Sequence, residues 1–328
     1  MTAPEPVSWG ILSTARINEL VLEGVRAFPR VRTRAVGSRD AGRAEAYARE
    51  HGLERAYGTY DELLADADVE AVYVSLPNAF HVEWTIRALR AGKHVLCEKP
   101  LTRRPEEAEE VFDVAAREGR LVMEAFMWAH APQIRRAREL IDRGEIGELR
   151  LVRATHAFTA DDPRDIRLLT ELDGGSLMDV GCYCVHAARL FAGEPERVYA
   201  EPIRNGAGLD VRLAGTMLFP GGVVAHFDCG LDVPVREELE LVGADGSLYL
   251  PDPWHATAPR LELRRGGRVE LEPVATADPY GLELDNLSAA IRGEAKPLLG
   301  RDDAVAQARA LDALFRSAEE RAPVVLDQ

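Results

Sequence analysis

The first 126 residues alternate between short runs of β-favouring apolar residues and stretches in which apolar residues recur every three or four positions. The short runs predict five strands: Val7–Leu12, Val31–Gly37, Ala71–Leu76, His94–Cys97 and Leu121–Phe126. The periodic stretches predict four helices between them: Ile17–Phe28, Arg43–His51, His81–Ala91 and Glu106–Glu118. This alternation predicts a doubly wound α/β domain with a parallel sheet, in which ligands bind at the carboxyl ends of the strands.

The pattern changes after Phe126. Between Arg197 and Val274 short β-favouring runs are separated by turn signals such as Asn205-Gly206 and Asp245-Gly246, which predicts a large, open and mostly antiparallel sheet. The predicted helices of this part are Ile134–Arg143, Leu177–Phe191, Tyr280–Arg292 and Asp302–Glu320, and Leu149–Phe158 is predicted to be extended. We therefore expect two α/β domains, residues 1–126 and 127–328.

Composition and charge narrow the class of protein. The 328 residues include 40 Lys and Arg against 55 Asp and Glu, a formal net charge of −15. Proteins that follow nucleic-acid phosphates usually carry the opposite sign, so we expect no nucleic-acid partner. Because no apolar run reaches the length of a membrane span and the first residues do not resemble a signal peptide, we expect a cytoplasmic protein that is not in a membrane. The four cysteines do not suggest a disulfide framework.

The turn after the first strand partly matches the dinucleotide-binding fingerprint G-x-G-x-x-G/A. Gly10 and Ala15 occupy its first and third small positions, whereas Leu12 occupies the second. Such a turn aims backbone N–H groups at a pyrophosphate, and Ser13 and Thr14 would add hydroxyl donors. The match also fits an ordinary strand-to-helix turn, but its place between the first strand and the first helix favours a cofactor.

The end of the second predicted strand bears on which dinucleotide binds. Ser38 and Arg39 follow that strand, and a hydroxyl and a guanidinium suit the 2′-phosphate of NADP. A site for NAD places a carboxylate there, and Asp40 is that group if the strand ends later. Asp40 fits better as the cap of a helix, bonded to the backbone of Arg43. We therefore expect NADP, with NAD as the alternative and a solvated surface charge as the other interpretation of Arg39.

Later strand ends carry further candidates. Lys99 follows a strand and precedes Pro100, which fixes the backbone, so that its ammonium can point at a substrate oxygen and stabilise a developing alkoxide. The alternative is a surface lysine paired with Glu98. Besides the first turn, Ser38, Arg39 and Arg43, the side chains expected near the cofactor are Leu76, Asn78, His81 and Glu98.

A polar stripe is predicted on the helix after the long loop. Asp179, Tyr183 and His186 are four and three residues apart, so a helix places them on one face. These groups are costly to bury unless they bond to one another or to a ligand, and a phenol near a lysine can exchange the proton of a substrate hydroxyl. Ser176 with Asp179 also fits a capping box, and His186 fits better as a core imidazole than as a catalytic group.

Two further groups of residues bear on metal and substrate binding. Cys182, Cys184 and His186 are two residues apart, and on a helix the first and second do not face each other, so we expect no metal site. Trp128, Arg167 and Tyr280 are candidates to line a substrate pocket together with His186, although Trp128 could equally fill the core.

Four motifs then occur in the order typical of one family: Gly10–Ala15, Pro77-Asn78-x-x-His81, Glu98-Lys99-Pro100 and Gly174–Tyr183. Together they resemble the glucose–fructose oxidoreductase/inositol dehydrogenase (Gfo/Idh/MocA) family, which tolerates leucine at the second glycine position. The start Trp9–Ser13 and Tyr183 resemble the branch of dimeric dihydrodiol dehydrogenases and NADP-linked D-xylose 1-dehydrogenases. The stretch Ala129–Pro132 differs from the aromatic, His and Pro run of many relatives.

The resemblance implies a Rossmann domain and a second α/β domain whose open sheet often joins subunits, here into a homodimer or homotetramer. It also implies that Lys99 binds the reacting oxygen and that Asp179 and Tyr183 belong to the catalytic site. We expect an NADP-dependent oxidoreductase that moves a hydride between nicotinamide and a hydroxyl-bearing carbon of a sugar or cyclic diol. The alternatives are a non-catalytic nucleotide sensor of this fold and a sugar–sugar oxidoreductase with tightly bound cofactor.

Overall fold

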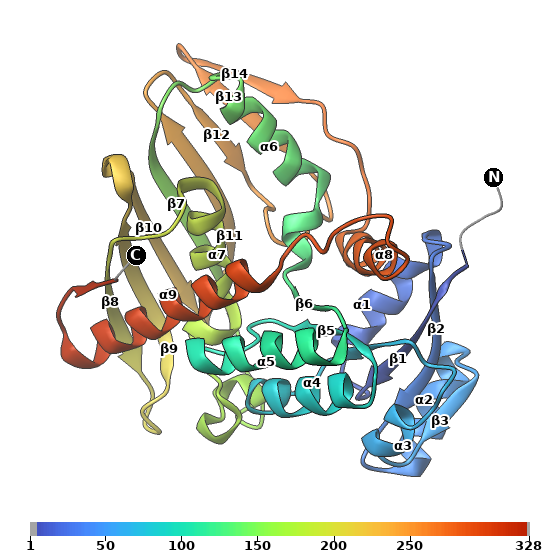
Figure 1. Ribbon diagram of the computed structural model, residues 1–328. Helices are drawn as coiled ribbons and strands as arrows, with labels where there is room; N and C mark the ends of the chain where they lie inside the picture. The colour runs from blue at the N-terminus through green and yellow to red at the C-terminus, as the bar shows by residue number, and fades with distance from the viewer. Residues whose placement is uncertain (1–4, 327–328) are drawn as a thin grey trace. The chain divides into compact units, whose positions relative to one another are not determined.

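The computed structural model describes residues 5–326, which form two compact units (Figure 1). The first unit extends to Thr102 and includes Glu106–Met127 and Asp278–Ala304, and the second comprises Arg103–Pro105, Trp128–Ala277 and the residues from Val305 onward. The first unit thus includes a segment that the expected boundary places in the second domain. The division into domains at residue 126 stays a prediction.

The first unit is built on a six-stranded parallel sheet of order β3-β2-β1-β4-β5-β6. Its strands are β1 Val7–Leu12, β2 Val31–Gly37, β3 Arg55–Tyr57, β4 Ala71–Val74, β5 His94–Glu98 and β6 Val122–Ala125. The strand order reverses between β1 and β4, so that the carboxyl ends of these two strands form the switch point at which such sheets bind ligands. The prediction of a doubly wound parallel sheet is confirmed.

Helices connect these strands as the periodicity predicts, with small differences. The α-helices are α1 Ile17–Gly24, α2 Ala41–His51, α3 Tyr60–Leu64, α4 His81–Arg90, α5 Pro105–Glu118 and α8 Pro279–Ile291, and 3₁₀ turns occur at Val25–Ala27, Asn78–Phe80 and Met127–His130. The sequence did not predict β3 and α3, because elements of three and five residues are too short to show a period.

Helix α8 belongs to the first unit because of specific packing. The indole Nε1 of Trp9 in β1 donates to the hydroxyl of Ser288 at 3.0 Å, and both side chains are buried. A Cβ on Gly281 would lie 2.2 Å from the ring of Phe28, so this glycine lets α8 approach closely. Helix α8 therefore packs against Trp9 and Phe28, which are more than 200 positions away in the sequence.

The second unit is built on a nine-stranded sheet of order β14-β13-β12-β11-β7-β10-β9-β8-β15. The strands are β7 Leu149–Thr159, β8 Arg197–Arg204, β9 Asp210–Leu218, β10 Val224–Gly230, β11 Asp232–Gly243, β12 Ser247–Leu250, β13 Leu261–Arg265, β14 Arg268–Glu272 and β15 Val324–Val325. β7 and β10 pair in parallel and the other neighbouring strands of this sheet pair antiparallel, which confirms the expected mostly antiparallel sheet.

Three longer helices complete this part of the chain: α6 Pro132–Asp142, α7 Cys182–Ala192 and α9 Arg301–Glu320. Single 3₁₀ turns occur at Ile166–Leu168, Thr170–Leu172 and Pro220–Gly222. The helix predicted over Leu177–Phe191 begins as a π-helical turn, Leu177–Gly181, before α7. Within residues 5–326, no helix is both long and apolar enough to cross a membrane.

Candidate active site

The turn after β1 is held in an unusual conformation at the switch point. Ser13 has a φ of 142°, which few residues other than glycine adopt. Its hydroxyl donates to the carbonyl of Ser75 at 2.9 Å and accepts from the backbone N–H of Ala15 at 3.1 Å. Asn18 in α1 donates to the Ser13 carbonyl at 3.0 Å. Such a strained residue persists only where its surroundings fix it, so this turn is tied to the end of β4 and to α1.

Gly10 and Leu12 lie before this turn, inside β1. A Cβ on Gly10 would lie 2.8 Å from a terminal methyl of Leu63, so β1 packs closely against α3 at this residue. Gly10 thus lies within the strand that the sequence predicts, and the turn itself begins after Leu12. Leu12 itself is fully buried, which explains how a large residue is tolerated at the second glycine position.

The end of β2 presents cations rather than an available carboxylate. Asp40 caps α2, where one of its oxygens accepts from the backbone N–H of Arg43 at 2.7 Å. Arg39 and Arg43 are exposed, and neither pairs with a carboxylate among the residues described. Ser38 adds a hydroxyl that accepts from the Asp40 N–H at 3.3 Å. This donor set fits a phosphate on the ribose better than it fits a ribose hydroxyl.

His81 joins two strand-end loops. Its Nδ1 lies 2.8 Å from the carbonyl of Pro100, and its Nε2 lies 2.7 Å from the carbonyl of Leu76. Burial lowers the pKa of the imidazole, although the two carbonyls favour its protonated form. The imidazole thus lies between the loop after β4 and the loop after β5, with a ring nitrogen at hydrogen-bond distance from a carbonyl in each.

Lys99 lies at the carboxyl end of β5, as the sequence predicts, and is half-buried. The adjacent Glu98 accepts a hydrogen bond from the phenol of Tyr73, and its other oxygen accepts from the backbone N–H of Lys99 at 3.3 Å. Tyr73 is fully buried in β4. The Glu98 carboxylate therefore links the lysine backbone to the core of the sheet.

A second carboxyl group, which the sequence analysis missed, lies in the same region of the first unit. Glu283 in α8 is 0% exposed, and neither of its carboxyl oxygens has a hydrogen-bond partner among the described residues. Burial raises its pKa well above the usual value, and the charges of Glu98 and Asp278 add to this. The pKa of Tyr73 is also raised well above its usual value. Burial is the largest cause, and the charges of Glu98 and Glu283 add to it. Burial thus favours the protonated form of Glu283, and nothing in a helical sequence pattern signals such a group.

The glycine pair before α7 is required by close packing in the second unit. A Cβ on Gly174 would lie 2.4 Å from the carbonyl of Arg167. Gly175 has a φ of 111°, and a Cβ there would lie 2.4 Å from Asp210. One Asp210 oxygen accepts from the Ser176 hydroxyl at 2.7 Å and from the backbone N–H of Leu177 at 2.8 Å. The capping box considered for Ser176 and Asp179 therefore does not form, because Asp210 from β9 takes the serine.

Asp179 is brought together with Arg167, another predicted site residue. Arg167 Nε donates to Asp179 Oδ2 at 2.9 Å, and its Nη1 donates to Asp165 Oδ1 at 3.2 Å. The charge of Asp179 is the largest cause that raises the pKa of the Arg167 guanidinium. The carboxylate is thus held in a fixed ion pair, with 15% of its side chain exposed.

Tyr183 and His186 both lie among aromatic rings. The Tyr183 ring packs edge-on to His156, with centroids 5.0 Å apart, and against Trp254 at 5.7 Å. His186 is fully buried and lies edge-on to Trp128 at 5.4 Å. Trp128 is also fully buried, which agrees with its alternative role as core filling. Tyr280, the remaining substrate candidate, is buried in α8 of the first unit.

The cysteines and acidic groups bear on metal binding. All four cysteines are free thiols, and burial raises the pKa of Cys184 and Cys229 well above the usual value. Glu237, Asp252 and His255 offer potential ligand atoms within 4.8 Å of one another. Both Asp252 oxygens, however, accept from backbone N–H groups of residues 255–258, so this cluster is explained as a hydrogen-bonded turn.

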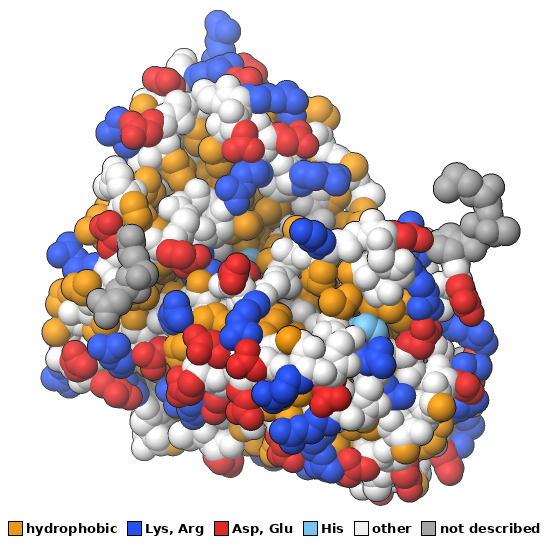
Figure 2. Space-filling model, viewed as in Figure 1, with side chains coloured by type: hydrophobic (Ala, Val, Ile, Leu, Met, Phe, Trp, Pro, Cys, Tyr) orange, Lys and Arg blue, Asp and Glu red, His pale blue; other side chains and the backbone are white. Residues whose placement is uncertain are grey.

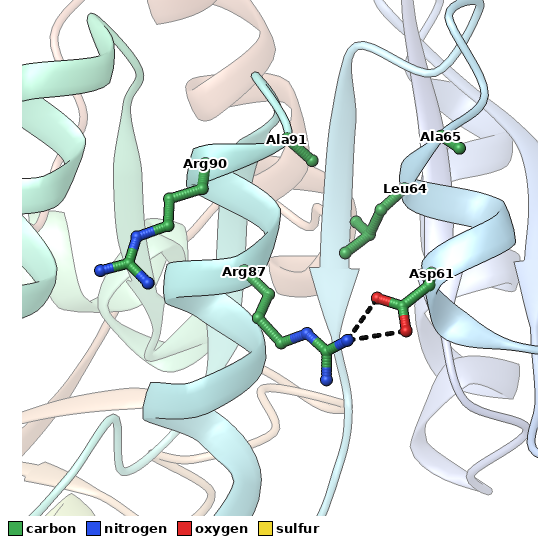
Figure 3. Close-up of a pocket in the computed structure, with 6 residues that line it drawn as sticks. All are labelled: Asp61, Leu64, Ala65, Arg87, Arg90 and Ala91. Carbon is green, nitrogen blue, oxygen red and sulfur yellow. Dashed lines mark hydrogen bonds and ion pairs between the residues drawn. The ribbon is translucent and has the colours of Figure 1, made fainter.

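Two surface features lie outside these sites. The face seen in Figure 2 shows acidic and basic side chains interspersed. A cavity of about 370 Å³ is lined by residues of α3 and α4, where Arg87 donates to both carboxylate oxygens of Asp61 at 2.6 and 2.7 Å (Figure 3). It lies near the carboxyl-terminal ends of these helices. Because helices in such folds run opposite to the strands, this cavity is at the other edge of the sheet from the switch point.

A sheet of this order, with a fixed turn at its switch point and a lysine at a neighbouring strand end, is the architecture of dinucleotide-dependent oxidoreductases. The family model described as an oxidoreductase family with an NAD-binding Rossmann fold matches residues 8–126, and the model of the GFO/IDH/MocA C-terminal domain matches residues 134–249. The chain belongs to the Gfo/Idh/MocA oxidoreductase family, which confirms the resemblance inferred from its motifs.

Several relatives are similar over most of the chain. D-xylose 1-dehydrogenase (NADP(+)) 2 of Haloferax volcanii is 39% identical over 97% of this chain and 99% of its own length. Trans-1,2-dihydrobenzene-1,2-diol dehydrogenase of Bos taurus is 33% identical over 76% of each chain. The crystal structure of a 3-ketoreductase from Actinomadura kijaniata, in complex with NADP and TDP-benzene, has a TM-score of 0.90 at 33% identity and covers 95% of this chain and 98% of its own.

Proposed function

We propose that this protein is an NADP-dependent oxidoreductase that transfers a hydride between nicotinamide and a hydroxyl-bearing carbon of a sugar or cyclic diol. The observation that carries the proposal is the similarity over nearly the whole chain to an NADP-linked xylose dehydrogenase. The similarity to a dihydrodiol dehydrogenase and a sugar ketoreductase supports the same class of substrate.

The cations at the end of β2 support the choice of NADP. Arg39 and Arg43 would bind the 2′-phosphate, and Ser38 would donate to it, while Asp40 is engaged in capping α2. The turn from Ser13 to Ala15 would give backbone N–H groups to the pyrophosphate at the start of α1. Leu76, Asn78 and the Glu98 region would border the nicotinamide end of the site.

When bound, the cofactor supplies the hydride acceptor or donor, and the chain supplies binding, orientation and proton handling. Lys99 would bind the substrate oxygen and stabilise its negative charge as the carbon–hydrogen bond breaks. Tyr183 would exchange the hydroxyl proton, and Asp179, fixed by Arg167, would orient the substrate or Lys99. The mechanism requires the Lys99 ammonium and the Tyr183 phenol to act on the same substrate, which is a prediction.

A panel of aldoses and cyclic diols, assayed with NADP and NAD side by side, tests this proposal through the absorbance of the reduced nicotinamide. We expect turnover with NADP on at least one of these substrates. Tight NADP binding without turnover on the whole panel would favour the nucleotide sensor instead. Purified protein that already contains cofactor, and that reduces one sugar while it oxidises another, would favour the sugar–sugar oxidoreductase.

We also propose a cytoplasmic location and a homodimer or homotetramer formed through the sheet of the second unit. The free thiols agree with a reducing compartment. Side chains such as Val235, Val269 and Leu271, which are 71%, 60% and 66% exposed on this sheet, agree with a surface that other subunits cover. The molar mass in solution, measured by light scattering, tests the assembly: 36.1 kDa would contradict it.

A further inference from the structure

One carboxylate in the second unit faces two imidazoles. Glu237 in β11 lies directly opposite His156 in β7 in the antiparallel register, so their side chains project from the same face of the sheet. Glu237 Oε1 lies 3.5 Å from Nε2 of His156 and 3.1 Å from Nδ1 of His255. Neither the sequence motifs nor the proposed mechanism gives these residues a role.

The same His156 ring contacts the phenol that we assign to proton exchange. His156 stacks on the indole of Trp254 with an interplanar angle of 16° and lies edge-on to Tyr183 at 74°. Trp254 is fixed in turn, because its Nε1 donates to the carbonyl of Thr155 at 2.9 Å. Tyr183 thus packs against two rings that are each held by a further contact: His156 by Glu237, and Trp254 by the carbonyl of Thr155.

The negative charge of Glu237 strengthens its contact with His156. Burial opposes the ionisation of Glu237, but hydrogen bonds from His156 and His255 outweigh it and lower the pKa of this carboxyl to about 2. Glu237 is therefore an anion at neutral pH. A carboxylate bonded to one ring nitrogen fixes both the orientation of an imidazole and the nitrogen that carries the proton. Other titratable groups lie around this cluster. His255 is edge-on to His156, Cys182, Cys184 and His186 share the helix of Tyr183, and Asp179 lies in the preceding turn.

We propose that Glu237 and His156 are positioning residues for Tyr183, in which the carboxylate fixes the imidazole and the edge of the imidazole fixes the phenol ring. This inference rests on the proposed function, because it assumes that Tyr183 exchanges the substrate proton. Neither residue needs to touch the substrate. A phenol that is held at one angle is seldom in an orientation from which it cannot exchange the proton. The contribution of Glu237 and His156 is therefore expected in kcat.

A double-mutant cycle tests whether Glu237 acts through His156. Glu237→Gln keeps the shape of the side chain and removes the charge, and His156→Phe keeps a ring and removes its nitrogens. We expect each to lower kcat by about tenfold while KM and the NADP dissociation constant stay within about twofold. The double variant should be no slower than the slower single variant. Losses that multiply to about a hundredfold, or single variants with unchanged kcat, would overturn the proposal.

Glu238→Gln is the matched control, because Glu238 is the next residue of β11, is exposed, and lies opposite Thr155. It removes the same charge from the other face of the strand, and we expect wild-type kcat. If His156→Phe fails to fold, Glu237→Asp replaces it: the retained charge should leave kcat between that of wild type and Glu237→Gln. An Asp variant as slow as the Gln variant would contradict the role of the charge.

A measurement without substrate separates this inference from the proposed function. Protein labelled with ¹³C at the tyrosine Cζ gives one NMR signal per tyrosine, and Tyr183→Phe assigns the signal of Tyr183. We expect this signal to move in Glu237→Gln and in His156→Phe but not in Glu238→Gln. A signal that stays in place in both variants would refute the contact. A signal that moves, in a protein that turns over no sugar or diol, would leave the positioning intact and reject the proposed function.

Discussion

Replacing Glu283 by glutamine should change how stability depends on pH. Glu283 is fully buried in α8 and has no hydrogen-bond partner within the described part of the chain, and its pKa is raised well above the ordinary 4.5, first by burial and then by Glu98. The folded protein therefore keeps a proton that the unfolded chain releases above pH 4.5. Since the folded pKa is the higher one, this group favours folding at low pH, and its contribution is lost as pH rises towards the folded pKa.

The magnitude follows from the release of one proton. Between the unfolded and folded pKa values, wild type should lose about 1.4 kcal/mol of unfolding free energy per pH unit relative to Glu283→Gln. Glutamine has nearly the same shape and cannot ionise, so the variant should become the more stable protein as pH rises. The difference should level off below pH 4.5, where both states of the wild-type group are protonated.

Urea unfolding at a series of pH values and constant ionic strength measures this difference. Equal m-values would show that both proteins expose the same surface on unfolding. Glu23→Gln is the control, because Glu23 is an exposed residue of α1 in the same unit, and its curve should run parallel to that of wild type. Parallel curves for wild type and Glu283→Gln would refute the reasoning, since Glu283 would then carry the same charge in both states.

The remaining predictions concern the cofactor end and the glycine pair. Arg39→Ala should weaken NADP binding by about tenfold and leave NAD binding unchanged, as fluorescence titration can measure, because a charge-assisted hydrogen bond to the 2′-phosphate contributes about 1.5–3 kcal/mol; equal losses for both dinucleotides would contradict that role. Gly175→Ala should lower the unfolding free energy by more than about 2 kcal/mol, because its φ is 111° and the added Cβ would meet Asp210. Gly52→Ala, with a φ of 68° and nothing within 4 Å of the added Cβ, should cost less, and an equal cost would show that the clash with Asp210 is relieved.

Periodicity in the sequence predicts the longer strands and helices and misses the shortest, β3 and α3. The bounds of β1 and β2 agree with the expected runs to the residue, because both runs contain β-favouring residues and a serine follows each of them. The predicted helix over 177–191 could not show its π-helical first turn, at the start of which Asp210 from β9 accepts two hydrogen bonds. That contact joins residues more than 30 positions apart, and no local pattern contains it.

The candidate site divides in the same way. Lys99 could be predicted, because a lysine between a strand and a proline is a local signal. Glu283 and Glu237 could not, because each is an ordinary glutamate in its own element and gains its character from neighbours on other elements: Glu98 for the first, and His156 for the second. The class of reaction came from the resemblance to a family. Residue spacing alone left open whether Lys99 is a catalytic lysine or a surface lysine paired with Glu98.

The most direct test of the central claim is turnover by wild type and Lys99→Ala on the sugar and diol panel, with the NADP dissociation constant measured on the same samples. Lys296→Ala is the matched control, because Lys296 is an exposed lysine of the same unit. We predict that Lys99→Ala lowers kcat by at least about a thousandfold while NADP binds within about twofold of wild type, and that Lys296→Ala stays fully active. A Lys99→Ala enzyme that oxidises its substrate at a rate near that of wild type would contradict the account.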